Sequence, residues 1–219
     1  TESVAQHTFA MLFYLLEKLP YYDRYVKDEK YIGDKMFTHF DKHFGELAKM
    51  TWGIIGLGNI GRRVADIAKA FGCRVIYYST SGRNSQPGYE RVSFEELLKE
   101  SDIVSVHAPL DENTLDLMNK EAFHQMKKTA IFLNLGRGPI VVEEDLAEAL
   151  EQGEIAAAGL DVLRVEPMSP ENPLRRIKDS EKLLITPHIA WASVEARTRL
   201  MEIICGQIQE FFSNGSPES

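Results

Sequence analysis

The hexapeptide GLGNIG at Gly56–Gly61 constrains the fold of this 219-residue chain more than any other feature. It closes an apolar run, 51–56, that we expect to be a strand, and it leads into a segment, 59–71, that we expect to be a helix. In such a unit the first glycine permits a tight turn, the second lets the backbone approach a pyrophosphate, and the third lets helix and strand pack closely. The helix N-terminus adds free N–H groups and a positive dipole end. The hexapeptide therefore predicts a dinucleotide-binding domain, with an unliganded glycine-rich turn as the alternative.

Strands and helices alternate along the rest of the chain. A capping box, Ser93 with Glu96, marks one helix start, and Gly72 and Gly153 follow two helix ends. Alternation of this kind predicts βαβ units, and strands that are near-continuous apolar runs are typical of a sheet covered on both faces. The expected fold class is therefore α/β, a Rossmann-type doubly wound parallel sheet. Further strands are expected at 74–79, 102–107, 129–135, 155–161 and 183–186, and helices at 93–99, 120–127, 143–152 and 194–212.

The first 50 residues do not follow this alternation. Apolar residues at helical spacing predict a helix from Val4 to Leu19, with Ser3 as its N-cap and Pro20 as its stop. The segment 21–49 is polar and aromatic without a clear period, so we expect a connection. It contains His39 and His43, four residues apart as in a helical metal pair, but no third ligand lies near in sequence. We therefore predict no metal site.

Composition excludes several classes of partner. The net charge of −8 argues against binding to nucleic acid or to an anionic membrane, although local arginines still allow a small anionic substrate. No apolar run reaches membrane-spanning length, and the N-terminus carries Glu2 and no basic segment, so neither a membrane span nor a signal peptide is expected. Cys73 and Cys205 are far apart, and we expect two buried, reduced thiols. The expected compartment is the cytoplasm.

The end of the second strand bears on the choice of dinucleotide. An acidic residue at this point usually holds the adenosine ribose of NAD. This strand ends instead in Ser79, and Thr80 and Arg83 follow without any acidic residue from 67 to 89. Small hydroxyls and a guanidinium suit a 2′-phosphate, which favours NADP over NAD. The alternative is that Arg83 is only solvated and that backbone groups and hydroxyls hold NAD.

Three chemically useful side chains follow later strands, where ligands bind in sheets of this type. Arg137 follows the fourth strand, Glu166 the fifth and His188 the sixth. Hydride transfer to a 2-keto acid needs a cation for the carboxylate and a proton donor for the carbonyl oxygen, and histidine is the usual donor near neutral pH. A glutamate on its second nitrogen would fix the tautomer and favour the charged form. The alternatives are a structural arginine, a capped surface histidine and a solvated glutamate.

Four motifs in this order resemble those of the D-isomer-specific 2-hydroxyacid dehydrogenases. They are GLGNIG at 56–61, NLGRG at 134–138, GLDV at 159–162 with Glu166 and Pro167, and TPHIA at 186–190. The resemblance runs from about Val4 to the closing helix, and the segments 188–193 and 78–83 are similar to the glycerate dehydrogenase/hydroxypyruvate reductase branch. It implies that Arg137 binds the substrate carboxylate and carbonyl oxygen, and that His188 is the acid/base paired with Glu166.

The resemblance also implies the residues that surround NADP or NAD. Asp161 would hold the nicotinamide carboxamide, and Thr114 would lie near the phosphates. The expected cofactor-binding set is Gly56, Gly58, Asn59, Ile60, Gly61, Ser79, Thr80, Arg83, His107, Ala108, Pro109, Thr114, Leu135, Gly136, Asp161 and Ala190.

Members of this family have a second, substrate-binding domain, and its early βα units have no counterpart here. We therefore expect a fragment with three parts: a crossover helix and connection at 1–50, a dinucleotide-binding Rossmann domain at 51–191, and a closing helix with a disordered tail at 192–219, the tail being 213–219. Such a chain should bind the dinucleotide but turn over weakly or not at all, because one wall of the substrate cleft is missing. A homodimer through the crossover helix is expected, since such helices pack between subunits in the family.

Other functions stay open on the sequence. The family's transcriptional corepressors use the same fold as dinucleotide-sensing binding proteins, so fold does not settle the matter. A second enzymatic alternative is a different substrate, such as a phosphorylated hydroxy acid or formate.

Overall fold

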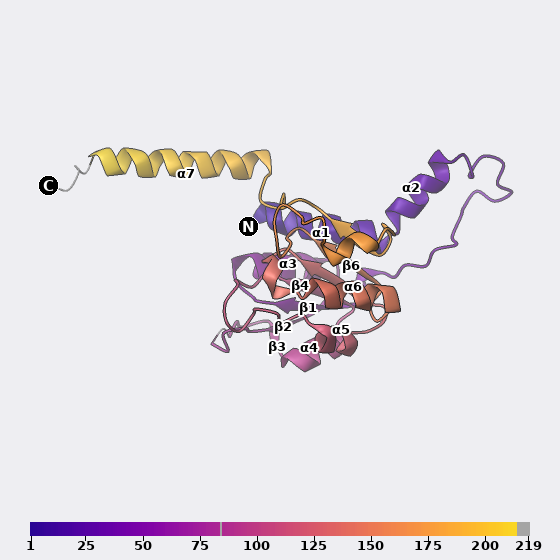
Figure 1. Cartoon of the computed structure of the whole chain (residues 1–219), viewed down its shortest axis with the longest axis horizontal. Coiled ribbons are helices and arrows are strands. Elements are labelled where there is room, and N and C mark those ends of the chain that lie inside the picture. The colour runs from indigo at the N-terminus through magenta and orange to yellow at the C-terminus, as the bar shows by residue number, and fades with distance from the viewer. Residues whose placement is uncertain (84, 214–219) are drawn as a thin grey trace.

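One parallel sheet carries the fold in the computed structural model, which describes residues 1–83 and 85–213 (Figure 1). In this described part the sheet has seven strands in the order β3-β2-β1-β4-β5-β6-β7, every pair of neighbours parallel. The order reverses direction between β1 and β4, which confirms the predicted doubly wound Rossmann-type sheet. The strands are β1 (Thr51–Ile55), β2 (Arg74–Tyr78), β3 (Glu90–Arg91), β4 (Ile103–Val106), β5 (Ile131–Asn134), β6 (Ala157–Leu160) and β7 (Leu183–Ile185).

Helices cover both faces of the sheet and divide the core into two layers. The first layer holds α1 (Glu2–Leu16) and α3 (Asn59–Ala70), and the second holds α4 (Phe94–Glu100), α5 (Lys120–Gln125) and α6 (Glu143–Gln152). Successive side chains of a strand point to opposite faces, so Ile54 packs in the first layer and Ile55 in the second. At the start of α4 the Glu96 N–H donates to Ser93 Oγ at 3.2 Å, as the capping box predicted.

The N-terminal segment differs from the prediction. The first helix ends at Leu16, the chain turns at Lys18 with a left-handed φ of 55°, and a second helix, α2 (Leu19–Lys27), begins. Pro20 lies in the first turn of α2, where proline is tolerated because that N–H has no partner within the helix. It therefore begins a helix rather than ending one.

Two other expectations for this segment were wrong. The first helix starts at Glu2, and Ser3 is not its cap, because the Ser3 hydroxyl donates to the Ala190 carbonyl at 2.5 Å. A short 3₁₀ helix, η1 (Leu47–Lys49), precedes β1 within the expected connection.

The two histidines of this connection do not form a helical pair. His39 lies outside the helices, stacked on the Tyr25 ring at 3.8 Å, with Nε2 2.8 Å from the Tyr21 hydroxyl. No group of three potential metal ligands occurs among the residues described.

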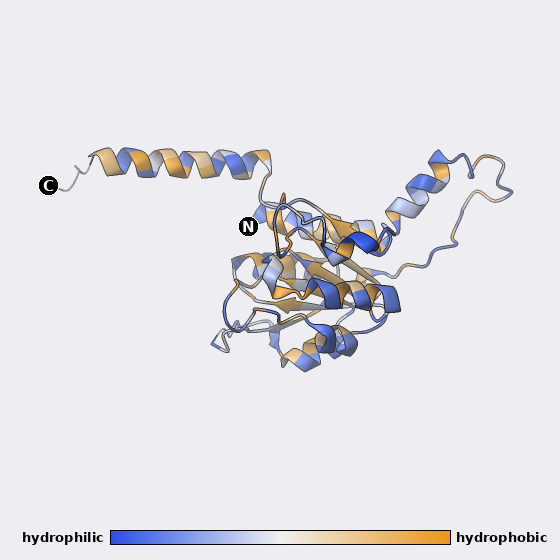
Figure 2. Cartoon of the chain, viewed as in Figure 1, coloured by the Kyte–Doolittle hydropathy of each residue, from blue (hydrophilic) through white to orange (hydrophobic). Residues whose placement is uncertain are grey.

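The closing helix, α7 (Val194–Ser213), extends away from the sheet (Figure 1). Apolar and polar residues alternate along it (Figure 2), and many of its large apolar side chains are exposed. Both cysteines are free thiols, as predicted, but only Cys73 is buried, whereas Cys205 is exposed on α7. The expected disordered tail, 213–219, lies outside the described residues except for Ser213. No helix in the described ranges is both long and apolar enough to span a membrane.

Candidate active site

The carboxyl ends of the strands bring the predicted site residues to one edge of the sheet. Backbone hydrogen bonds join neighbouring ends: the Gly56 N–H donates to the Tyr78 carbonyl at 3.0 Å, and the His107 N–H to the Ile55 carbonyl at 2.8 Å. The Asp161 N–H donates likewise to the Asn134 carbonyl at 3.0 Å. The loops after β1, β2, β4, β5, β6 and β7 therefore form one continuous rim.

The glycine loop has the geometry of a pyrophosphate site. Gly56 has a φ of +90°, and a Cβ there would lie 2.8 Å from the Ala108 backbone. A Cβ on Gly61 would lie 2.3 Å from the Gly56 carbonyl oxygen, whereas a Cβ on Gly58 would meet no described atom within 4 Å. Gly58 is the N-cap of α3, and none of the described side chains caps that helix. The first-turn N–H groups can therefore face an anion, as a dinucleotide requires.

Two arginines lie at the loop after β2. Ser79 is buried and Arg83 is exposed, with the Arg83 N–H 3.3 Å from Ser81 Oγ. The Arg91 guanidinium donates to the Gly82 carbonyl at 2.9 Å, so a second arginine lies at this loop. Sequence reasoning missed Arg91 because β3 has two polar residues and no apolar run to mark it. This end of the site is positively charged.

His107 has a buried ring nitrogen with no partner. Ser105 Oγ accepts from Trp52 Nε1 at 2.8 Å and lies 3.1 Å from His107 Nε2. The other ring nitrogen, Nδ1, is buried and has no hydrogen-bond partner among the described residues. Burial lowers the pKa of His107 to about 3 and keeps the ring neutral. An unpartnered polar nitrogen in the loop after β4 fits a bound polar ligand.

This histidine should make the stability of the fold depend on pH. The unfolded chain protonates His107 below its ordinary pKa of 6.5, whereas the folded-state pKa is about 3. Because the folded pKa is the lower one, its contribution to stability is complete above pH 6.5 and is lost as the pH falls toward 3. We expect urea unfolding to show a loss of about 2 kcal/mol from this residue between about pH 7 and about pH 4.5.

In the variant His107→Asn, the free energy of unfolding should fall less between these two pH values. His124→Asn, at an exposed histidine, should show the same fall as the wild type. An equal loss in the wild type and in His107→Asn would contradict the assignment.

His188 and Glu166 form a hydrogen-bonded pair, with Nδ1 2.7 Å from Oε2. The other Glu166 oxygen accepts from the Leu163 N–H at 2.7 Å. Burial alone would raise the pKa of Glu166, but the hydrogen bonds from His188 and Leu163 and the charges of His188 and Arg137 together lower it below its usual value. An ionised Glu166 orients the Nδ1–H and leaves His188 Nε2 for proton exchange. The two side chains are 42% and 35% exposed.

The loop that carries His188 is tightly held. His188 has a φ of +55°, and its N–H donates to the carbonyls of Asp161 and Thr186 at 2.8 and 2.9 Å. The Asp161 carboxylate accepts from the N–H groups of Ile189 and Ala190, both at 2.9 Å, and from the Thr186 hydroxyl at 2.6 Å. Asp161 thus anchors this loop, and its contact with a nicotinamide stays a prediction.

Arg137 lies on the same rim. Its side chain is exposed, and Nη1 donates to the Gly136 carbonyl at 2.8 Å. Its positive charge contributes to the lowered pKa of Glu166. Asn134 fixes this turn, since its Oδ1 accepts from the Gly136 N–H and its Nδ2 donates to the Arg137 carbonyl, both at 3.0 Å. The guanidinium is therefore presented to solvent beside the histidine–glutamate pair.

Thr114 is held inside its own loop. Its hydroxyl is fully buried, donates to the Pro109 carbonyl at 2.8 Å and accepts from the Asp111 N–H at 2.8 Å. It therefore shapes the loop after β4. Of the remaining predicted residues, Asn59 and Ile60 begin α3, and the others lie in the loops of the same rim: Thr80, Ala108, Pro109, Leu135, Gly136 and Ala190.

A carboxylate that sequence reasoning missed supports the Glu166 loop. Glu143, buried at the start of α6, accepts from the Arg164 N–H and from Asn172 Nδ2, both at 2.8 Å. In the sequence it resembles any acidic residue in the first turn of a helix. The fold uses it to fasten the loop around Glu166 to the second layer.

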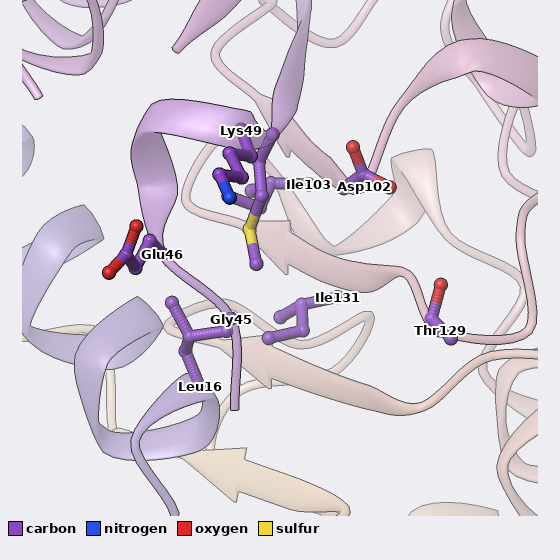
Figure 3. A pocket seen from close by; sticks show the side chains of 9 residues that line it. Leu16, Gly45, Glu46, Lys49, Asp102, Ile103, Thr129 and Ile131 are labelled. Atoms are coloured by element: carbon purple, nitrogen blue, oxygen red, sulfur yellow. The ribbon is translucent and has the colours of Figure 1, made fainter. Parts of the chain in front are cut away.

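Two cavities lie at opposite edges of the sheet. One of about 480 Å³ adjoins the catalytic candidates Glu166 and His188, with apolar walls that include Leu163, Met168 and Ile185. The other, of about 250 Å³, lies at the amino ends of β4 and β5 among residues that include those labelled in Figure 3. Of these two, only the first adjoins the His188–Glu166 pair.

Known proteins share this architecture. The family described as "D-isomer specific 2-hydroxyacid dehydrogenase, NAD binding domain" matches residues 9–190. A hydroxypyruvate reductase of Blautia hydrogenotrophica is 38% identical over 222 residues, which cover 99% of this chain and 67% of that protein. The D-lactate dehydrogenase of Aquifex aeolicus, solved with NAD and lactic acid, superposes with a TM-score of 0.87 at 30% identity, covering 97% of this chain and 67% of that one.

A third similar protein was solved with the other dinucleotide. The acyclic imino acid reductase Bsp5, in complex with NADPH and D-Arg, has a TM-score of 0.84 at 31% identity and covers 97% of this chain and 65% of its own. The chain thus spans about two thirds of the length of these proteins. The glycine loop, the parallel sheet and the match over residues 9–190 agree, and the chain belongs to the D-isomer specific 2-hydroxyacid dehydrogenase family.

Proposed function

We propose that the protein acts as an NAD(P)-dependent oxidoreductase that interconverts a D-2-hydroxy acid and its 2-keto acid. The observation that carries this proposal is the 2.7 Å contact between His188 Nδ1 and Glu166 Oε2 on the rim that also holds Arg137 and the glycine loop. A binding protein needs the loop alone, whereas a proton donor, its orienting carboxylate and a cation for the substrate together suit an enzyme. Nothing favours the corepressor alternative.

Each of these side chains has a distinct part in the reaction. Arg137 binds the substrate carboxylate and the carbonyl oxygen through the bidentate geometry that a guanidinium offers. On reduction, His188 Nε2 gives its proton to the carbonyl oxygen, and on oxidation it takes the proton from the hydroxyl. Glu166 holds the Nδ1–H in place and stabilises the charged ring.

The dinucleotide, when bound, supplies or accepts the hydride. We assign its pyrophosphate to Gly56–Gly61 and its binding as a whole to residues 51–191. The clear space at Gly58, the uncapped α3 and the orphaned His107 Nδ1 support this assignment.

The substrate class follows from the family. We propose a small 2-keto acid such as hydroxypyruvate or glyoxylate, the compounds for which a related hydroxypyruvate reductase and a related glyoxylate reductase are named. Because the chain spans about two thirds of such relatives, full turnover should also need a substrate domain that closes over the rim.

The proposal is tested by following NADH and NADPH oxidation with hydroxypyruvate, glyoxylate and a panel of other 2-keto acids. We expect the dinucleotide to bind this chain, with slow turnover that rises when the chain is joined to a substrate domain. Full-rate turnover by the chain alone would contradict the need for closure. Failure of the joined protein to reduce any 2-keto acid would contradict the activity.

We further propose that NADP is preferred over NAD. A hydroxyl at Ser79 and positive charge at exposed Arg83 and nearby Arg91 support this preference, because both suit a 2′-phosphate and no acidic residue from 67 to 89 would repel it. Arg83→Ala should weaken NADP binding about tenfold, because a charge-assisted hydrogen bond is lost, and leave NAD binding within about twofold. Titration calorimetry with both dinucleotides measures this.

Arg63→Ala is the matched control, since Arg63 is an exposed arginine of α3 that pairs with Glu2. Unchanged NADP affinity in Arg83→Ala would remove the case for this residue.

We also propose a homodimer, but not through the apolar face of the crossover helix, α1. That face, with Phe9, Leu12 and Leu15, is buried against the sheet of its own chain. Large exposed apolar side chains gather instead on α2 and the segment that follows it: Leu19, Val26, Tyr31, Ile32, Met36, Phe37, Phe40 and Phe44. Sedimentation velocity should show a dimer that Phe37→Asp dissociates, and a monomeric wild-type protein would contradict this.

A further inference from the structure

We propose that Ser3 and His7, one turn apart on α1, are positioning residues that hold the loop of His188 in its working geometry. The inference rests on the proposed role of His188 and concerns what keeps that residue in place. It gives α1 a part in the reaction although none of its side chains belongs to the predicted site.

The two contacts reach opposite ends of the His188 loop. The Ser3 hydroxyl donates to the Ala190 carbonyl at 2.5 Å, and His7 Nε2 lies 3.0 Å from Thr186 Oγ1. The first contact joins residues that are 187 positions apart in the chain, and the second joins residues that are 179 positions apart. Residues at i and i+4 share one face of a helix, so one turn of α1 holds both ends of the loop. In Figure 1 the amino-terminal end of α1 lies close to the segment that leads into α7.

The hydrogen-bond direction at His7 follows from its neighbours. The Asp161 carboxylate can only accept, so the Thr186 hydroxyl donates its hydrogen to Asp161 Oδ1 at 2.6 Å. Thr186 Oγ1 therefore accepts at its other side, and His7 Nε2 carries the hydrogen that it receives. His7 Nε2 is also 3.6 Å from Asp161 Oδ1. A chain of donors thus runs from α1 through the threonine to the carboxylate.

That carboxylate is the centre of the loop. Asp161 is 2% exposed and accepts the N–H groups of Ile189 and Ala190, which flank His188 on its C-terminal side. His188 itself has a φ of +55°, a conformation that a residue with a side chain keeps only when its surroundings fix it. The contacts from α1 complete those surroundings.

The rest of α1 makes it a firm support. Phe9, Leu12 and Leu15 are buried against the sheet, and the Phe9 ring lies 4.9 Å from the Trp52 ring of β1. The helix is therefore fixed to the same sheet whose strand ends carry the glycine loop. Through Ser3 and His7 the position of His188 is set relative to that loop.

Amide hydrogen exchange of Ile189 and Ala190 tests the proposal directly in this chain. His7→Leu and Ser3→Ala should each speed exchange at these two amides about five- to tenfold, the change expected when one hydrogen bond of ordinary strength is lost. His7→Gln should restore slow exchange, because a carboxamide N–H can donate to Thr186 Oγ1. Gln6→Leu, on the exposed face of α1, is the matched control and should exchange like the wild type.

Kinetics provide the second readout. In the active protein, His7→Leu should lower kcat about five- to tenfold and leave the KM for the dinucleotide within about twofold, with recovery in His7→Gln. Wild-type exchange rates at Ile189 and Ala190 in both His7→Leu and Ser3→Ala would overturn the proposal, whatever the activity. Faster amide exchange in these variants of a protein that reduces no 2-keto acid would support the positioning role of Ser3 and His7 and would refute the proposed function instead.

Discussion

Replacing His188 with asparagine is expected to lower kcat about 10²- to 10⁴-fold, the usual contribution of a positioned general acid. Asparagine is chosen because it tolerates the left-handed backbone, with a φ of +55°, better than alanine does. The loop should therefore keep its shape while the proton donor is lost. Dinucleotide affinity should stay within about twofold, because the pyrophosphate site lies on a different loop.

Two companion variants sharpen this experiment. Glu166→Gln keeps an acceptor for His188 Nδ1–H at the present 2.7 Å contact but removes the charge, so kcat should fall at least about tenfold. His124→Asn, at an exposed histidine whose Nδ1 is 3.4 Å from Glu154, controls for loss of a histidine–glutamate pair elsewhere. Steady-state turnover of a 2-keto acid measures all three, and normal turnover in His188→Asn would refute the acid/base assignment.

Gly58→Ala should weaken dinucleotide binding about 100-fold and leave the Tm of the free protein unchanged. A Cβ at this position meets no described atom within 4 Å, and Gly58 has a φ of −80°, which any residue adopts. The methyl group would instead enter the space over the uncapped N-terminus of α3, where the pyrophosphate should approach the backbone. The predicted loss corresponds to about 2.7 kcal/mol of binding free energy.

Gly61→Ala should lower the stability of the free protein as well as dinucleotide binding. The contrast with Gly58→Ala separates a clash with the ligand from a clash within the fold. A Cβ at Gly61 would lie 2.3 Å from the Gly56 carbonyl oxygen, so helix and strand must separate even without a ligand. We expect this variant to lose both binding and about 1–3 kcal/mol of folding stability. Fluorescence titration with NADPH and thermal unfolding separate the two effects. A Gly58→Ala protein that binds normally would refute the pyrophosphate assignment.

The sheet could be predicted from the sequence because its strands are buried on both faces. Runs such as 103–106 and 131–134 are mostly apolar, and every residue in them is buried. The same logic failed at β3, where Glu90 and Arg91 pair only at the sheet edge and remain exposed. It also failed at Pro20, since proline suits the first turn of a helix as well as it follows a helix end.

The site was predictable to the extent that strand ends converge. Arg137, Glu166 and His188 could be placed on one rim because the carboxyl ends of parallel strands meet there. Their supports could not be predicted, because Ser3, His7 and Glu143 act through contacts between segments that are far apart in the sequence. A helical serine or glutamate has the same local pattern whether or not such a contact exists.

The contacts that hold His188 and Glu166 come from opposite faces of the sheet. The His188 loop is fastened to α1 in the first layer, and the Glu166 loop is fastened through Glu143 to α6 in the second. The 2.7 Å hydrogen bond between His188 and Glu166 therefore depends on how the two layers are aligned. A core substitution that moves either layer by a fraction of an ångström should change this hydrogen bond. We expect such a variant to transfer the proton slowly and still to bind the dinucleotide.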